Sequence, residues 1–120
     1  MITYKLGEIE MKFCEIVWEN EPINSGGVVS FAWEKLAWKK STTYTVLRKL
    51  CEKGILQNKD SVVTSLISKA DYNALRSEKF VEETFSGSLP SFLTAFSSRK
   101  KLSQKEIEEI EKIINENRER

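Results

Sequence analysis

Residues 38–56 read WKKSTTYTVLRKLCEKGIL, and this stretch decides the fold of the chain. Its apolar side chains recur at the spacing of an α-helix, and Gly54 is a natural C-terminal stop. Ser41 or Thr42 can supply the N-cap, because either side chain can accept a hydrogen bond from the first turn. The side of this predicted helix that faces the core consists of Thr43, Leu47 and Leu50, flanked by Val46 and Cys51.

The opposite side of the predicted helix carries hydroxyl and cationic side chains. Four of the five residues from 41 to 45 are Ser or Thr. Thr is a poor helix former, and an N-cap explains Ser41 or Thr42 but not Thr45. Short hydroxyls and cations suit the base edges and phosphates of double-stranded DNA; the alternative is an ordinary polar helix surface. The candidate DNA contacts are Lys39, Lys40, Ser41, Thr42, Thr45, Arg48, Lys49 and Lys59. We expect the two threonines to contact bases and the cations to contact mainly phosphates.

The charge of the chain is unevenly distributed. The formal net charge is only +1, yet residues 1–34 contain two lysines and six glutamates, and residues 35–59 contain seven cations and one glutamate. A basic segment of this kind is typical of a face that binds phosphates, although a solvated basic helix surface gives the same pattern.

The neighbouring residues predict two more helices and a hairpin. Residues 8–18 place Ile9, Phe13 and Val17 on one buried stripe, and Pro22 ends that helix. A second helix is expected from Ile23 to about residue 36. Residues 55–58 and 62–66 are short strand-like runs around the polar turn 59–61. This order of elements predicts a winged helix-turn-helix, whose third helix enters the major groove of DNA.

The remaining residues are expected to form three helices, at about 70–85, at 89–96 and from Ser103 onward. Phe80 of the first of these is expected to be buried. Ser103 and Glu106 form a capping-box pattern at the start of the last. Residues 97–101 are expected to form an exposed basic loop. The apolar surface of this part exceeds what about 50 residues can bury internally, which predicts a homodimer. The expected dimerisation residues are Leu89, Phe92, Leu93, Phe96, Ile107, Ile110 and Ile114.

These expectations define the fold class and the domains. We predict a mainly α fold with a small β-hairpin (α+β), made of a winged helix-turn-helix and a C-terminal helical dimerisation domain. The DNA-binding domain is placed at residues 1–69 and the dimerisation domain at residues 70–120.

Composition excludes several classes of protein. The chain has no histidine, which removes His-based catalysis and the usual zinc ligands. Its two cysteines, Cys14 and Cys51, are expected to be free thiols, and no metal or cofactor is expected. No window is apolar enough to insert in a membrane, and the first residues lack a signal core, which predicts a cytoplasmic protein.

The residues also resemble those of a known family, the BlaI/MecI/CopY penicillinase repressors, over essentially the whole chain. The most specific part of the resemblance is Trp38-x3-Thr42-x2-Thr45-x-Leu47-x2-Leu50-x2-Lys53-Gly54-x-Leu56. Further matches, weak individually but in the right order, are Leu6-x3-Glu10, Trp18, Pro22-Ile23, Asp71-Tyr72, Gly87-Ser88-Leu89 and Leu102-Ser103.

The resemblance implies a homodimeric repressor that binds double-stranded operator DNA, one half-site for each winged helix, and silences β-lactam-resistance or related operons. It also implies a third partner, a membrane-bound sensor metalloprotease, whose signal leads to cleavage in the dimerisation domain. The matching bond in this chain joins Ala95 and Phe96.

The chain departs from that family at four places. It has Lys39-Lys40-Ser41 where relatives usually have Ser-Pro-Lys, Lys59-Asp60-Ser61 where they have a Gly-Arg turn, and Ala95 where they have asparagine. The copper-sensing branch ends in Cys-x-Cys, whereas residues 115–120 contain no cysteine, so metal sensing by that route is not expected.

Two other classes of function remain as alternatives. A winged helix can serve as a protein–protein interaction module without operator binding, although the basic segment and the threonine face argue against this reading. An enzyme is the other class. The carboxylates lie mostly in charged helical stripes, such as Glu108 with Lys112, and show no catalytic spacing, so no enzymatic activity is expected.

Overall fold

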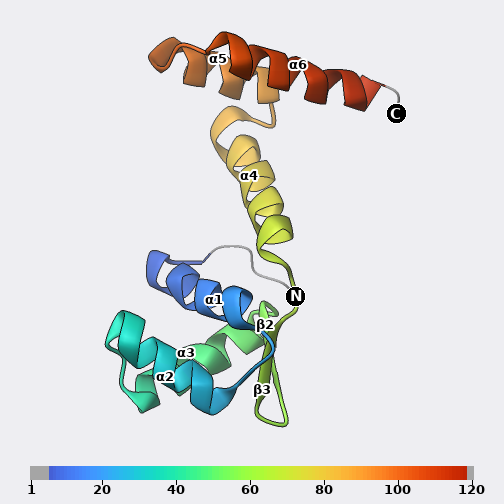
Figure 1. Cartoon of the computed structure of the whole chain (residues 1–120). Coiled ribbons are helices and arrows are strands. Elements are labelled where there is room, and N and C mark those ends of the chain that lie inside the picture. The colour runs from blue at the N-terminus through green and yellow to red at the C-terminus, as the bar shows by residue number, and fades with distance from the viewer. Residues whose placement is uncertain (1–5, 119–120) are drawn as a thin grey trace. The chain divides into compact units, whose positions relative to one another are not determined.

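The structure, a computed structural model, describes residues 6–118. Figure 1 shows the order of the helices and strands along the chain. The residues cluster into two compact units, residues 1–77 and residues 78–120, and the boundary falls inside the helix α4 (Lys69–Phe85). The expected mainly α fold with a small β component is confirmed.

Unit 1 begins with the helices α1 (Glu8–Asn20) and α2 (Ser25–Leu36). The Asn24 side chain caps α2 by accepting a 2.7 Å hydrogen bond from the Gly27 N–H. Ala37, in the left-handed conformation with φ 57°, ends α2 and turns the chain toward the next helix. The expectation that Ile9 is buried is wrong, because Ile9 lies in the first turn of α1 and is exposed.

The third helix, α3 (Lys40–Glu52), confirms the spacing of the decisive segment: Thr43, Leu47 and Leu50 are buried. The predicted cap is wrong. Lys39 is the N-cap residue and makes no side-chain cap hydrogen bond, so Ser41 and Thr42 lie inside the first turn.

A three-stranded antiparallel sheet follows, in the order β1-β3-β2. The predicted hairpin is confirmed as β2 (Leu56–Lys59) and β3 (Val62–Ser65). Its turn is Asp60 and Ser61, both with positive φ, a two-residue connection that matches the twist of the strands. The expectation that Ile23 and Asn24 open α2 is wrong. They form β1 (Ile23–Asn24), which pairs with Val63 and Val62 of β3.

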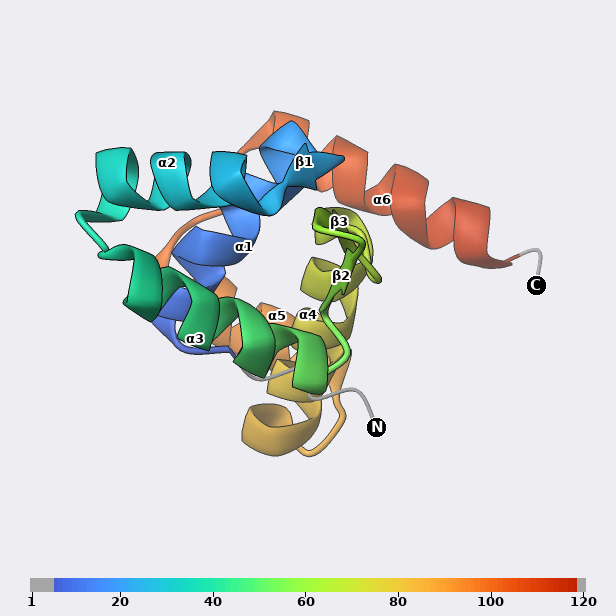
Figure 2. The ribbon, with the colours of Figure 1, turned by 90° about the horizontal axis from the view of Figure 1, so that it is seen from below.

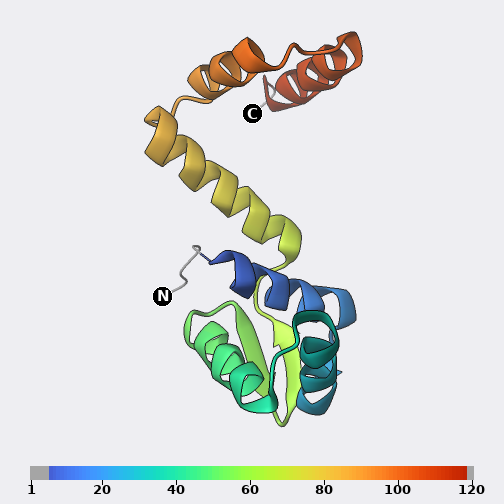
Figure 3. The same ribbon diagram turned by 90° about the vertical axis from the view of Figure 1, so that its left-hand side faces the viewer.

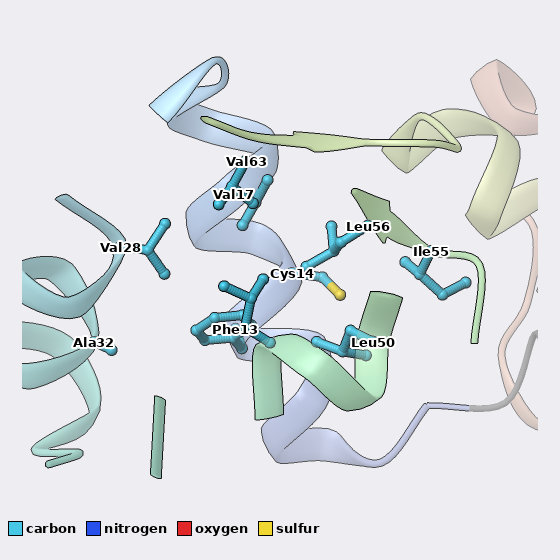
Figure 4. Close-up of a cluster of buried hydrophobic side chains, with 10 residues drawn as sticks. Phe13, Cys14, Val17, Val28, Ala32, Leu50, Ile55, Leu56 and Val63 are labelled. Atoms are coloured by element: carbon cyan, nitrogen blue, oxygen red, sulfur yellow. The ribbon is translucent and has the colours of Figure 1, made fainter. Parts of the chain in front are cut away.

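The core of unit 1 lies between the three helices and the hairpin, which Figure 3 shows grouped together. Every element from α1 to β3 except β1 contributes fully buried side chains. Figure 4 shows them converging: Phe13, Cys14, Val17, Val28, Ala32, Leu50, Ile55, Leu56 and Val63. Burying such side chains contributes roughly 1.5–3 kcal/mol each, and it fixes α3 against α1 and α2.

The start of α4 belongs to unit 1. Lys69 Nζ lies 2.9 Å from Glu15 Oε1 of α1. The Trp18 and Tyr72 rings lie 5.9 Å apart, and Trp18 Nε1 donates a 3.0 Å hydrogen bond to the Ile67 carbonyl. These contacts hold the first turns of α4 on α1.

Unit 2 contains the end of α4 together with α5 (Leu89–Arg99) and α6 (Gln104–Arg118). Ser88 caps α5, and the predicted capping box of Ser103 and Glu106 is confirmed by reciprocal hydrogen bonds of 3.0 and 3.1 Å. The expectation that a loop begins at residue 97 is wrong, because α5 continues to Arg99 and only then does a short connection follow.

Candidate nucleic-acid interface

The outer side of α3 is a continuous polar surface. Figure 2 shows α2, α3 and the hairpin on one side of unit 1, with α1 behind them. The structure leaves all eight predicted DNA contacts exposed. Seven of them lie on or directly before α3, and the eighth, Lys59, ends β2.

The N-terminus of α3 concentrates positive charge. Lys39 and Lys40 occupy the N-cap and the first helical position, and the first turn contains no acidic residue. The helix dipole already makes this end positive, so cations here destabilise the helix by roughly 0.3–1 kcal/mol. Two lysines at a helix N-terminus therefore form a local anion-attracting surface whose unfavourable charge a bound phosphate would neutralise.

The hydroxyls on α3 differ in their hydrogen bonding. Thr45 Oγ1 donates a 2.9 Å hydrogen bond to the Ser41 carbonyl, one turn earlier. The buried Thr43 does the same toward the Lys39 carbonyl at 3.1 Å. Within residues 6–118, the hydroxyl of Thr42 makes no hydrogen bond of this kind or to any other partner.

An acidic residue, Glu52, lies at the C-terminal end of the outer side of α3. Glu52 Oε1 lies 3.9 Å from Arg48 Nε, and both side chains are largely exposed. A pair of this kind stabilises the helix by less than about 1 kcal/mol, so Arg48 stays available to another anion.

The hairpin is short and fixed at its tip. The Ser61 carbonyl accepts a 2.8 Å hydrogen bond from the Ser25 N–H at the start of α2. At the other end of β3, Ser65 donates from its N–H and its hydroxyl to Glu21 Oε1 at 2.8 and 2.9 Å. Lys59 and Asp60 lie at the exposed tip. The β2–β3 hairpin therefore presents one cation and one carboxylate at a tip that hydrogen bonds hold in place.

The position of α3 depends on a pair that sequence reasoning missed. Lys53, directly after α3, donates from Nζ to both carboxylate oxygens of Glu10 on α1, at 3.0 and 2.9 Å. The two residues are 43 positions apart, so helical spacing could not join them. Both are residues on which the family resemblance rests, Lys53 in its most specific part and Glu10 in a separate, weaker match, and that resemblance was the available signal.

A hollow of 490 Å³ lies between α3 and β2 and is lined by Tyr44, Leu47, Arg48, Cys51, Leu56, Gln57, Asn58 and Leu66. Both cysteines are free, as expected. Burial raises the pKa of Cys14 to about 12, with the Glu10 carboxylate adding to the rise. Burial also raises the pKa of Cys51, although a hydrogen bond from the Asn58 backbone acts in the opposite direction. The raised pKa values keep both thiols mainly protonated at neutral pH, Cys14 more completely than Cys51.

Unit 2 carries the predicted dimerisation residues, and no residue from 78 to 118 is buried. Phe80, Phe85, Phe92 and Phe96 form a chain of ring contacts with centroid separations of 5.6–6.2 Å. Four of the seven predicted residues are exposed, including Leu89 at 63% and Phe96 at 43%. The expectation that Phe80 is buried is wrong, since its ring covers others and remains 49% exposed.

The proposed cleavage bond lies inside a helix. Ala95 and Phe96 belong to α5, and both are exposed. Proteases bind extended substrates, so cutting this bond requires local unwinding of α5.

Two absences apply to residues 6–118 alone. No helix in that range is long and apolar enough to span a membrane. Within the same range, no group of three or more Cys, Asp or Glu side chains is arranged to hold a metal ion.

Known proteins resemble this chain along most of its length. The methicillin resistance regulatory protein MecI of Staphylococcus aureus (strain Mu50) is 26% identical over 117 residues, covering 94% of this chain and 95% of MecI. The penicillinase repressor of Bacillus licheniformis is 27% identical over 120 residues, covering 97% and 94%.

A solved structure gives the same picture for the fold. The solution structure of monomeric Bacillus licheniformis BlaI in complex with the blaP half-operator superposes with a TM-score of 0.50 at 25% identity, covering 60% of this chain and 94% of that one. The family model described as penicillinase repressor matches residues 6–116. The chain belongs to the penicillinase repressor family.

Proposed function

We propose that this chain is a sequence-specific DNA-binding transcriptional repressor and that α3 is its recognition helix. The observation that carries the proposal is the outer side of α3, where exposed threonines lie among four cations on a helix whose other side is buried in the core. The solved relative BlaI, which is bound to a half-operator, supports this assignment. Such a surface binds DNA and requires no catalytic step.

The threonines and the cations have different roles in this proposal. Thr42 and Thr45 lie in the first two turns of α3, the part of a recognition helix that contacts base edges. Lys40, Arg48 and Lys49 contact mainly phosphates. Lys39 and Ser41 lie beside them, and Lys59 contacts the DNA backbone from the β2–β3 hairpin.

Residues 70–120 pair two copies of the chain in this proposal, and residues 1–69 read one half-site each. The exposed apolar side chains of unit 2 support this, because a second copy would cover surface that the single chain leaves in water. Linking two half-site interactions raises the affinity for a palindromic operator without new contacts.

Regulation follows from the same arrangement. The protein acts in the cytoplasm, and its target genes are β-lactam-resistance or related operons. Cleavage of Ala95–Phe96 after a signal from a membrane sensor metalloprotease separates α6 from the DNA-binding domain. Each freed winged helix keeps its α3 surface but loses the linkage, so operator occupancy falls.

A footprint of the purified full chain on the promoter of its own gene tests the proposal. Two protected half-sites, centred one helical turn or a multiple of it apart, are expected. If no DNA sequence is protected, and the chain instead binds a protein with an affinity that does not change with salt, the result would support the alternative of a protein–protein interaction module.

A further inference from the structure

The hydroxyl of Thr45 has a fixed hydrogen-bonding direction. A hydroxyl has one proton and two lone pairs, and a carbonyl can only accept. Because Thr45 Oγ1 lies 2.9 Å from the Ser41 carbonyl oxygen, the Thr45 proton points back along the helix. Only its lone pairs and its methyl group remain for a partner outside the chain.

This direction excludes most DNA partners of Thr45. Phosphate oxygens only accept hydrogen bonds, as do O6 and N7 of guanine and O4 of thymine in the major groove. The groups that donate there are the exocyclic amino groups, N6 of adenine and N4 of cytosine. We infer that the Thr45 hydroxyl reads an amino group, that of adenine or cytosine, by accepting a hydrogen bond from it at one position of each half-site. This inference rests on the proposed function.

Thr42 provides the internal comparison. Its hydroxyl is exposed and has no hydrogen-bond partner within residues 6–118, so it can both donate and accept. It can donate a hydrogen bond to a phosphate or a carbonyl, or accept one from an amino group, so it is not limited to accepting as Thr45 is. Two threonines three positions apart on one helix therefore have different recognition chemistry.

The experiment starts from a site selected by the full-length chain from random duplexes. At each adenine or cytosine of one half-site, the amino group is removed by substitution with purine or 2-pyrimidinone. Affinities are measured for the parent, for Thr45→Val, which keeps the shape but loses the oxygen, and for Thr45→Ser, which keeps the oxygen. Thr42→Val is the matched control.

One amino deletion is expected to weaken the parent and Thr45→Ser by roughly 3- to 10-fold, the effect of a single neutral hydrogen bond, and to leave Thr45→Val unaffected. Thr42→Val should keep the full sensitivity at that position. The coupling between Thr45→Val and the amino-group deletion identifies the contact between Thr45 and that base; a loss of affinity alone does not.

Two results would overturn the inference. One is coupling of Thr45 to a carbonyl deletion, made with 2-aminopurine for guanine or 5-methyl-2-pyrimidinone for thymine, since Thr45 would then donate. The other is the absence of coupling at every position of a selected site. If selection returns no consensus at all, the proposed function itself fails, and this outcome is distinct from both.

Discussion

Lys53 Nζ lies 2.9 Å from Glu10 Oε2 and 3.0 Å from Oε1, and this contact joins the C-terminal end of α3 to α1. The lysine and glutamate side chains are 30% and 23% exposed, so water screens the pair only in part. Burial raises the pKa of Glu10, but the hydrogen bond from the Gly7 N–H and the Lys53 ammonium outweigh this effect, and the pKa lies below its ordinary value of 4.5.

Glu10→Gln is therefore expected to lower the free energy of unfolding by about 1.5–3 kcal/mol at neutral pH. Because the folded-state pKa is depressed, the contribution of the carboxylate is complete above the unfolded value and is lost as the pH falls through the folded value. The difference between parent and variant should thus shrink below about pH 4.5 in denaturant titrations. Glu8→Gln, which removes a first-turn charge without an ion pair, is the control; an equal loss there would refute a specific role for the pair.

Lys40→Gln is expected to change stability and DNA affinity in opposite directions. Removing a cation from the N-terminus of α3 should stabilise the fold slightly, by roughly 0.3–0.5 kcal/mol. It should weaken all DNA sequences alike and reduce the slope of log affinity against log salt by about one unit. Thermal unfolding and salt titrations check the two effects. Lys12→Gln on α1 is the control and should leave the salt slope unchanged. If Lys40→Gln also keeps the slope of the parent, Lys40 does not contact a phosphate.

The two thiols should differ in reactivity. Cys14 is fully buried with a pKa of about 12, whereas Cys51 is half-buried beside the hollow between α3 and β2. An aromatic disulfide reagent at about pH 8 should label Cys51 first and Cys14 only at the rate of unfolding. Mass spectrometry of timed samples gives the order. Labelling of both at one rate in the folded chain would show that Cys14 is accessible.

The proposed dimerisation surface is tested best at a residue that does not support the packing of unit 2 itself. Phe92 contacts three other rings, so Phe92→Asp would disturb the helices as well as any interface. Leu89 is 63% exposed and makes none of these ring contacts. Leu89→Asp should yield monomers with parental helix content and greatly weakened operator binding, as seen by sedimentation and circular dichroism. Stable dimers at micromolar concentration would exclude Leu89 from the interface, and Thr94→Asp on the same helix is the control.

Local sequence patterns were sufficient for the features that form within a few neighbouring residues. The buried side of α3, the hairpin and the capping box at Ser103 follow from patterns within a few residues, and the structure confirms them. Features that join distant segments could not be predicted. The strand Ile23–Asn24 exists only because it pairs with β3, and Lys53 meets Glu10 across 43 positions.

Other misses have a local physical cause. Hydrophobicity alone predicted burial for Ile9 and Phe80, but it does not say whether another element covers the side chain. The N-cap of α3 was placed on a hydroxyl, whereas Lys39 occupies the cap and the hydroxyls of residues 41, 42 and 45 lie within the helix. These hydroxyls do not serve capping, which strengthens the case that they serve recognition.

The specificity ratio of the chain tests the account most directly. The measurement is the affinity at about 150 mM salt for the selected site and for a scrambled duplex of the same length and composition, with the parent and with a Thr42→Val, Thr45→Val double variant. The account predicts a parental ratio of at least about 1,000 that falls by roughly 10-fold or more in the variant, while binding to the scrambled duplex stays unchanged. A parental ratio near one, or a variant that loses both affinities equally, would contradict base reading by α3.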